Sequence, residues 1–201
     1  MYLIFDCTAN EKVKDYKVPF SDTFAWPKLV HLSWILLGED MKPIEDFDGI
    51  IDDEQLEITP AIMKSAKIDE DDIVKKKIAT KDLLSKFNDS VEKCTYIFSH
   101  NLALNENVLA AEFMRQSHPI GMFKKERFCL MQESTYFCKL PSKFGGYKWP
   151  SLTELHGTCF NTVYTPPNNA RADVIAATRC FIKLMRGNHL QDLFEKDDDE
   201  D

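Results

Sequence analysis

The sequence predicts an α/β domain in which a mixed central sheet is flanked by helices, and three observations support this fold class. Three apolar runs of strand length come first among the regular segments, which favours an antiparallel meander. Segments with helical periodicity then alternate with two short apolar runs, as in strands that are crossed by helices. A length of 201 residues, of which 44% are hydrophobic, is enough for one domain with its own core.

The three early strands follow from hydrophobic runs and the turn residues between them. Residues 2–6 are an apolar run that ends in an aspartate, which predicts a buried strand. Residues 9–28 are polar and contain two prolines, which predicts a loop. A second strand is expected over 29–37 and a weaker one near 43–51, joined by a turn at 38–40.

Helices and short strands alternate through the middle of the chain. Residues 80–93 place their apolar side chains on one helical face, and Thr80 is the expected N-cap. A short apolar run at 96–98 predicts a strand, and a helix is expected over about 105–117. Another short strand is expected near 127–131.

Two further helices and a charged tail complete the expected organisation. Ser151 followed by Glu154 fits a capping box, so a helix is expected to begin there. The last helix is expected over about 169–186, where apolar residues recur with helical spacing. The domain is then expected to span 1–190, and 191–201 to form a solvated acidic tail.

Charge and cysteine content limit the classes of partner. A net charge of −8 argues against a broad phosphate-binding surface, although a cleft for one strand end is compatible with it. The six cysteines form no close Cys-x-x-Cys pair, which argues against a zinc site. Without an export signal or an apolar run near the roughly 18 residues of a membrane span, we expect reduced thiols, a cytoplasmic location and no membrane association.

Three segments carry the candidate chemistry, and each lies at the end of a strand or the start of a helix. They are residues 2–8 (Tyr-Leu-Ile-Phe-Asp-Cys-Thr), 98–109 (Phe-Ser-His-Asn-Leu-Ala-Leu-Asn-Glu-Asn-Val-Leu) and 168–178 (Asn-Asn-Ala-Arg-Ala-Asp-Val-Ile-Ala-Ala-Thr). They contain the candidate site residues Asp6, Thr8, His100, Asn101, Asn105, Asn168 and Asp173.

In this order, the three segments resemble those of the DEDDh 3′–5′ exonucleases, a family typified by the proofreading subunit of bacterial DNA polymerase III. The stretch 148–155 (Lys-Trp-Pro-Ser-Leu-Thr-Glu-Leu) is also similar to family members. The resemblance implies an RNase H-like (exonuclease) fold. It also implies a site where two Mg²⁺ or Mn²⁺ ions, held by four carboxylates, stabilise the charge of phosphodiester hydrolysis while a histidine accepts a proton from the attacking water.

Three of the five functional positions implied by this resemblance are changed. Asp6 and Asp173 keep two carboxylates and are the expected metal ligands, if a metal binds. Thr8 stands in place of the family glutamate, Asn105 in place of the middle aspartate, and Asn168 in place of the histidine. Two carboxylates leave a pair of divalent ions about two charges short, and a general base alone is worth about 10²–10⁴-fold in rate.

Nearby residues are poor replacements. Glu106 follows Asn105 on a helix and is expected to point about 100° away, and a shifted alignment that recruits Glu106 or Glu112 is the alternative. Cys7 is expected on the opposite strand face from Asp6 and Thr8. The segment 65–68 stands where family members often carry a nucleotide-gripping Ile-His-Gly-Ile.

The candidate residues also have structural interpretations. Asp6 and Asp173 are metal ligands or structural acceptors, and Asn105 and Asn168 are helix caps if they have no catalytic role. His100 and Asn101 are substrate-binding or brace their loop by hydrogen bonds. Trp26, in the long loop, is a candidate for stacking on a base.

Three functions remain open at this level. The preferred one is an impaired or inactive exonuclease-like module that binds a single-stranded nucleic-acid 3′ end or a protein partner, with no cofactor. The second is an active exonuclease that uses Mg²⁺ or Mn²⁺ and releases nucleotides from DNA or RNA. The third is a protein-interaction domain without nucleic-acid contact, which the acidic charge favours.

Overall fold

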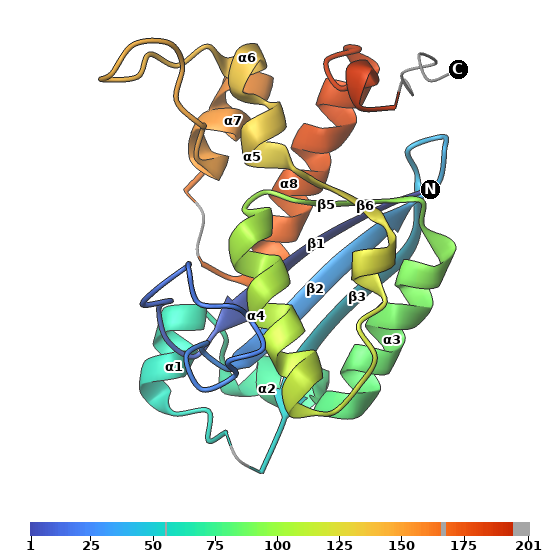
Figure 1. Ribbon diagram of the computed structural model, residues 1–201, viewed down its shortest axis with the longest axis vertical. Coiled ribbons are helices and arrows are strands. Elements are labelled where there is room, and N and C mark those ends of the chain that lie inside the picture. The colour runs from blue at the N-terminus through green and yellow to red at the C-terminus, as the bar shows by residue number, and fades with distance from the viewer. Residues whose placement is uncertain (55, 166–167, 195–201) are drawn as a thin grey trace.

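The computed structural model describes residues 1–54, 56–165 and 168–194, and a six-stranded mixed sheet lies at its centre (Figure 1). The strands are β1 (Tyr2–Ala9), β2 (Leu29–Leu37), β3 (Pro43–Asp52), β4 (Lys77–Ala79), β5 (Tyr96–Ser99) and β6 (Glu126–Cys129), in the spatial order β4-β3-β2-β1-β5-β6. β2 pairs antiparallel with β1 and β3, and the other pairs are parallel. The predicted fold class is therefore confirmed.

Helices cover both faces of this sheet (Figure 1). The helices are α1 (Pro60–Ala66), α2 (Glu70–Lys76), α3 (Thr80–Lys93), α4 (Leu102–Arg115), α5 (Leu130–Glu133), α6 (Thr135–Cys138), α7 (Leu152–Phe160) and α8 (Ala170–Arg186). One core joins α3 and α4 to the sheet face that carries Leu3 and Phe5, and a second joins α7 and α8 to the face of Ile4. β2 is buried along its whole length between these layers, which explains why its sequence is apolar without alternation.

Some boundaries differ from the expectations. α4 begins at Leu102, so Asn105 lies within the helix and not at its start. Thr80 is the first residue of α3 and does not cap it, because its hydroxyl donates to the Asp52 carbonyl (3.5 Å) and Ala79 occupies the N-cap position. The stretch between β3 and α3 forms α1, α2 and β4, which have seven, seven and three residues and are too short to show a clear period.

The last two predicted helices are present, and packing continues beyond the expected end of the domain. Ser151 and Glu154 form the predicted capping box of α7. A 3₁₀ turn at Gln191–Leu193 follows α8, and Phe194 packs on the rings of Tyr2 and Tyr96. The fold thus continues four residues past position 190, and the rest of the expected tail lies outside the described residues. No helix in the described ranges combines the length and apolar character needed to cross a bilayer.

Candidate active site at the end of the first strand

The candidate site lies where β1 extends beyond its parallel neighbour β5. The two strands pair only as far as Ile4, so β1 has an open edge beyond that residue. Alternation along the strand puts Asp6 and Thr8 on the face of Ile4, which α8 covers. Cys7 packs with Phe5 on the other face, under α4, as expected. Carboxyl ends of strands at such a position are where α/β proteins usually bind ligands.

Asn105 reaches across the open edge of β1 and binds Asp6. Its side chain is 2% exposed, and its Nδ2 donates to Asp6 Oδ1 (2.6 Å) and to Ser99 Oγ (2.7 Å). The Cys7 thiol donates to Asn105 Oδ1 (3.4 Å). The expectation that Asn105 caps a helix is wrong, because its amide is bonded to strand residues in the interior.

The carboxyl of Asp6 is in an environment that favours its neutral form. Burial and, to a smaller extent, the nearby charge of Asp173 raise its pKa to about 8, although hydrogen bonds from Asn105 and the Cys7 N–H oppose this rise. Asp6 therefore carries a proton at neutral pH when no cation is bound. The charge interaction also shows that Asp173 lies near enough to Asp6 to affect its titration.

Asp173 has a side-chain partner that the sequence analysis missed. The Tyr164 hydroxyl donates to Asp173 Oδ1 (2.9 Å) and lies 3.2 Å from the Ala172 carbonyl oxygen. Burial raises the pKa of Asp173, and the hydrogen bond from Tyr164 opposes that rise. Burial and then the charge of Asp173 raise the pKa of the Tyr164 hydroxyl, which therefore stays protonated and is a poor proton donor to a reacting group. The only signal in the sequence is a tyrosine nine residues before Asp173.

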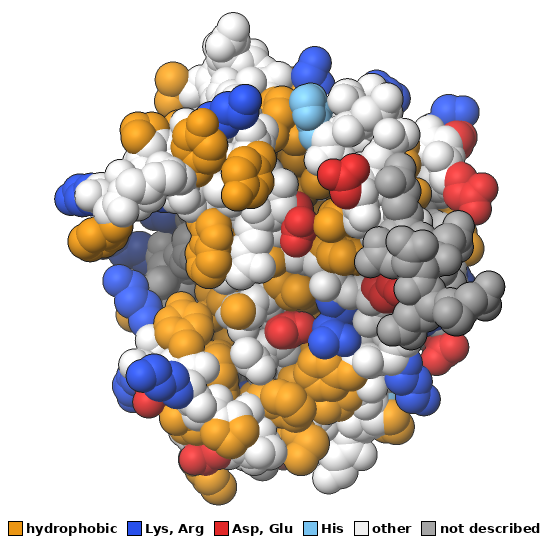
Figure 2. All heavy atoms as spheres, turned by 45° about the horizontal axis from the view of Figure 1, so that its top comes forward, with side chains coloured by type: hydrophobic (Ala, Val, Ile, Leu, Met, Phe, Trp, Pro, Cys, Tyr) orange, Lys and Arg blue, Asp and Glu red, His pale blue; other side chains and the backbone are white. Residues whose placement is uncertain are grey.

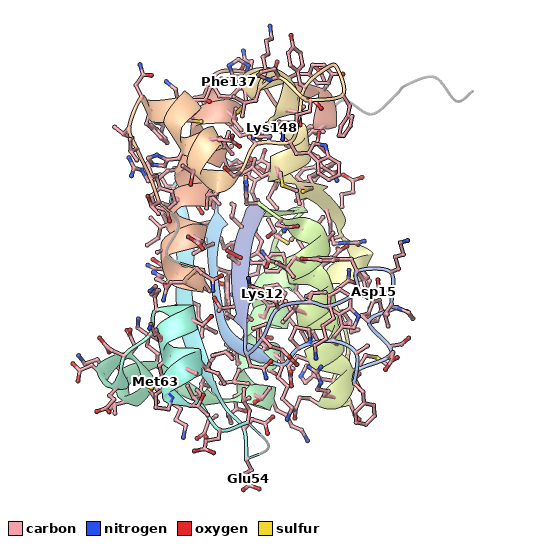
Figure 3. All side chains as sticks on the ribbon, turned by 90° about the vertical axis from the view of Figure 1, so that its left-hand side faces the viewer. Lys12, Asp15, Glu54, Met63, Phe137 and Lys148 are labelled. Atoms are coloured by element: carbon pink, nitrogen blue, oxygen red, sulfur yellow. The ribbon has the colours of Figure 1, made fainter. Side chains whose placement is uncertain are left out.

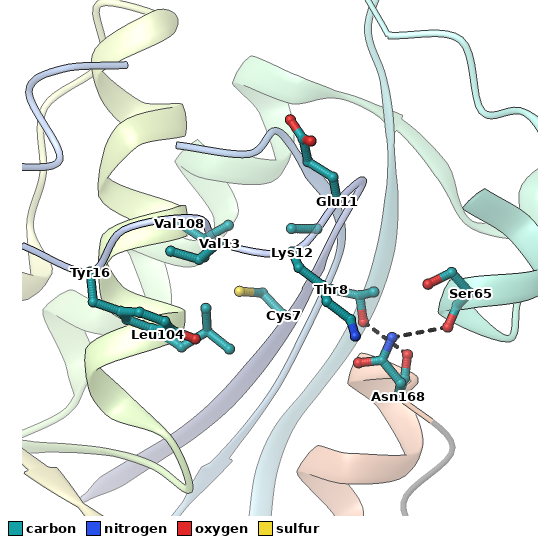
Figure 4. A pocket seen from close by; sticks show the side chains of 11 residues that line it. Cys7, Thr8, Glu11, Lys12, Val13, Tyr16, Ser65, Leu104, Val108 and Asn168 are labelled. Carbon is teal, nitrogen blue, oxygen red and sulfur yellow. Dashed lines mark hydrogen bonds between the residues drawn. The ribbon is translucent and has the colours of Figure 1, made fainter. Parts of the chain in front are cut away.

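Thr8 and Asn168 meet at the start of α8 (Figure 4). The Thr8 hydroxyl donates to the Asn168 carbonyl (3.4 Å), and Asn168 Nδ2 donates to the Ser65 carbonyl (2.9 Å). The N-cap of α8 is Asn169, whose side chain accepts a hydrogen bond from the Ala172 N–H (3.1 Å). The expectation that Asn168 caps the helix is therefore wrong by one residue.

Neither of the nearby glutamates reaches these residues. Glu106 forms an ion pair with Arg127 (3.0 Å), and Glu112 is buried in an ion pair with Arg115 (2.7 Å). Across the ranges that the structure describes, no three His, Cys, Asp or Glu side chains are grouped so that they could hold a metal ion. All six cysteines are free thiols.

The residues predicted to contact substrate have different surroundings. His100 and Asn101 form the turn between β5 and α4, with Asn101 at the N-cap position but without a side-chain bond. Burial lowers the pKa of His100 to about 4, and neither ring nitrogen has a hydrogen-bond partner of good geometry among the described residues. Trp26 is 3% exposed, and its Nε1 donates to the Val18 carbonyl (3.1 Å). The suggestion that Trp26 stacks on a base is wrong, because its ring is buried.

A pocket of about 440 Å³ opens beside Thr8 and Asn168 (Figure 4). Lys12 and Tyr16, from the loop after β1, contribute a cation and an aromatic ring. Lys12 lies near the middle of the side of the molecule that Figure 3 shows. Ser65 comes from the segment where the family resemblance placed a nucleotide-gripping stretch. The lining residues are Cys7, Thr8, Ala9, Glu11, Lys12, Val13, Tyr16, Ser65, Leu104, Val108 and Asn168.

Comparison with known proteins finds likeness in structure alone. No family model matches the chain, and no curated protein matches it. E. coli exonuclease I in complex with dA16 is 12% identical with a TM-score of 0.64, over 96% of this chain and 42% of that one. The present chain thus spans less than half of that relative.

Two smaller structures match over most of their length. The nuclease domain of 3′hExo, a DEDDh family member bound to rAMP, is 13% identical with a TM-score of 0.69, over 92% of both chains. A 3′-exonuclease that recognises the 3′ end of a histone mRNA stem-loop is 14% identical with a TM-score of 0.67, over 92% of this chain and 81% of that one. The chain therefore has the RNase H-like fold of the DEDDh 3′–5′ exonucleases.

Proposed function

We propose that this chain binds the 3′ end of a single-stranded nucleic acid at the end of β1 and hydrolyses it poorly or not at all. The second part of the proposal, that hydrolysis is poor or absent, rests on one observation. Both carboxyls that remain at the family positions accept hydrogen bonds from neutral side chains, Asp6 from Asn105 and Asp173 from Tyr164. A network of neutral donors thus surrounds the carboxyls where the family chemistry needs more carboxylates.

The donor set does not fit a two-metal centre. Mg²⁺ prefers several charged oxygen ligands and gives up its water reluctantly. Thr8 and Asn105 bring no charge, and the Asn105 amide directs an N–H group at Asp6. Asn168 cannot accept a proton at neutral pH, and the low pKa of His100 makes that ring a weak base. Hydrolysis by a pair of metal ions is therefore not a reaction that these residues support.

The pocket beside the site supports the binding part of the proposal. Its volume of about 440 Å³ lies in the range of small-ligand sites and suits a terminal nucleotide. Lys12 supplies a charge for a phosphate, and the exposed ring of Tyr16 supplies a surface for a base. The relatives of the same fold were solved with dA16 and with rAMP, and we extend that class of ligand to this chain.

An active exonuclease is the second candidate, and one observation favours it. Asp6 and Asp173 are close enough for their charges to interact, so a single Mg²⁺ or Mn²⁺ ion shared by both would relieve that repulsion. This candidate predicts release of nucleotides by the wild-type chain and loss of that activity in Asp6→Ala.

A 5′-labelled single strand with a free 3′ end, incubated with Mg²⁺ or Mn²⁺, separates the two candidates, because shortening and binding are both measured on it. We expect binding without shortening by the wild-type chain. Thr8→Glu, Asn105→Asp and Asn168→His together restore the family set, and we expect this triple variant to shorten the strand. Asn107→Asp, the same change two residues along α4, is the matched control and is expected to stay inactive. Shortening by the wild-type chain that Asp6→Ala abolishes would contradict the proposal.

A further inference from the structure

The segment between α6 and α7 forms an ordered hairpin at the upper end of the molecule (Figures 1 and 3). The Lys148 N–H donates to the Leu140 carbonyl (2.9 Å), and the Ser142 N–H donates to the Gly146 carbonyl (3.0 Å). Gly145, at the tip, has a φ of 90°, a backbone conformation that residues other than glycine rarely adopt. Residues 139–149 are called the Lys-aromatic hairpin below.

Large aromatic side chains are exposed on and beside this hairpin. Phe144 is 99% exposed and Trp149 57%. Tyr147 is also exposed, and its ring meets that of Tyr136, which is 77% exposed, at a centroid distance of 6.0 Å. Exposed aromatic rings gathered in one place usually mark a contact surface, since burying them is favourable.

The charge of the same stretch is opposite to that of the whole chain. The protein has 33 acidic residues among 201, yet no Asp or Glu stands between Glu133 and Glu154. Three lysines do, and while Lys148 pairs with Glu154, the structure shows no ion pair for Lys139 or Lys143 within the described residues. Figure 2 shows hydrophobic side chains beside Lys and Arg side chains along the left-hand edge of the upper face. This charge complements an anionic partner.

We propose that the Lys-aromatic hairpin binds single-stranded nucleic acid, at bases and phosphates beyond the terminal nucleotide. Exposed aromatic rings next to cations are the combination that non-specific single-strand binding uses, since every base can stack and every phosphate is anionic. Pro150, the residue after the hairpin, lies beside His100, in the turn that precedes the helix carrying Asn105. This inference rests on the proposed function, in which the pocket at β1 holds the strand end.

Fluorescence anisotropy with 5′-labelled single strands of about 3 and about 15 nucleotides tests the inference, because single-strand sites cover about 4–16 nucleotides. Phe144→Ala is expected to raise Kd for the longer strand at least about fivefold, as loss of a stacking ring does. Lys143→Gln is expected to reduce the slope of log K against log salt by about 0.7, the value for one lost phosphate contact on a single strand. Lys42→Gln, an exposed lysine in the β2–β3 turn, is the control and is expected to change neither quantity.

Strand length separates this inference from the proposed function. The hairpin variants are expected to bind the shorter strand as wild type does. Lys12→Glu in the pocket is expected to weaken binding of both strands. Unchanged binding of the longer strand by Phe144→Ala and Lys143→Gln, with weaker binding by Lys12→Glu, would overturn the hairpin inference alone. A wild-type chain that binds neither strand would overturn the proposed function with it. Self-association in sedimentation that Phe144→Ala abolishes would show that the hairpin instead contacts a second copy.

Discussion

Asn105 changes the chemistry of the site through one hydrogen bond, which its Nδ2 donates to Asp6 Oδ1. An amide has nearly the shape of a carboxylate, but it directs an N–H group at Asp6 and adds no charge. A carboxylate at this position would lie 2.6 Å from Asp6 Oδ1, and two carboxyls at such a distance cannot both ionise without a cation between them. The amide of Asn105 therefore binds Asp6 without the repulsion that a second carboxylate would bring.

Asp6→Asn is expected to make the free energy of unfolding less dependent on pH. The pKa of Asp6 is about 8 in the folded chain and near 3.8 when the carboxyl is exposed. Between these values the folded state holds a proton that the unfolded state releases. The contribution of Asp6 to stability is therefore full below about pH 4 and declines as the pH rises to about 8. Asn mimics the protonated carboxyl and does not titrate, so this decline is expected to disappear.

Urea denaturation at pH 5 and pH 8.5 measures the difference. Each pKa unit corresponds to about 1.4 kcal/mol, so even a shift half as large as the stated one is detectable. Asp15→Asn, on the surface loop after β1, is the control for the loss of an acidic residue. Parallel pH profiles for the wild type and Asp6→Asn would show that Asp6 is already ionised in the folded chain.

Tyr164→Phe is expected to destabilise the fold more at pH 8 than at pH 4. The hydroxyl donates to Asp173, and a hydrogen bond to a carboxylate is stronger than one to the neutral acid. Its loss is expected to lower the free energy of unfolding by about 1–2 kcal/mol where Asp173 is ionised, and by less where it is protonated. The matched control is Tyr147→Phe on the exposed hairpin. An equal loss at both pH values would indicate that the ring, and not the hydroxyl, is what matters.

The sequence pointed to candidate positions, but not to their hydrogen-bond partners. Short motifs at strand and helix ends predicted Asp6, Asn105 and Asp173 as site residues. The bond from Asn105 to Asp6 joins residues 99 apart in the chain and depends on where β5 stops pairing with β1. The bond from Tyr164 depends on the path of residues 161–165 after α7, which form no helix or strand. Neither path is encoded by a local period or a turn signal.

At the scale of elements, length decided what the sequence could predict. The 14 residues of α3 hold a full amphipathic pattern, and the expected bounds match those found. α1 and α2 have seven residues each, which is too short for a clear amphipathic pattern. Their starts are instead marked by the N-cap residues Thr59 and Asp69. α4 begins after Asn101, a residue type favoured at N-caps, but the Asn101 side chain makes no cap hydrogen bond, and the sequence analysis placed the start three residues later.

Asn169→Ala is expected to destabilise the protein more than Asn168→Gly does. Asn169 caps α8, and its Nδ2 also donates to the carbonyls of Ala66 (3.2 Å) and Lys67 (3.1 Å) at the end of α1. Losing a cap and these bonds is expected to lower the free energy of unfolding by about 2 kcal/mol. Asn168 has a φ of 60°, which glycine adopts freely, so Asn168→Gly removes chiefly one surface hydrogen bond. Denaturant titration measures the stability of both variants. A larger loss in Asn168→Gly than in Asn169→Ala would indicate that Asn168 is the residue that caps α8.

At the scale of the whole molecule, the acidity of the chain is concentrated at one end. Residues 195–201 contain six acidic residues and one lysine, so they carry −5 of the net charge of −8. The remainder is close to neutral, which leaves room for a local basic surface such as the Lys-aromatic hairpin. Composition alone argued against a broad phosphate-binding surface because it averages the tail with the domain.

Two truncated chains are expected to separate the effect of the acidic residues on stability from the effect of the packed C-terminal residues. A chain of residues 1–194 is expected to keep the stability of the full chain, because it keeps every packed residue that the structure describes and loses a net charge of −5. A chain of residues 1–190 also loses Phe194, whose ring contacts those of Tyr2, Tyr96 and Phe128. Removal of a packed Phe is expected to lower the free energy of unfolding by about 2–4 kcal/mol. Thermal unfolding of both chains at one salt concentration measures this, and equal midpoints would place the end of the fold at 190, as composition alone suggested.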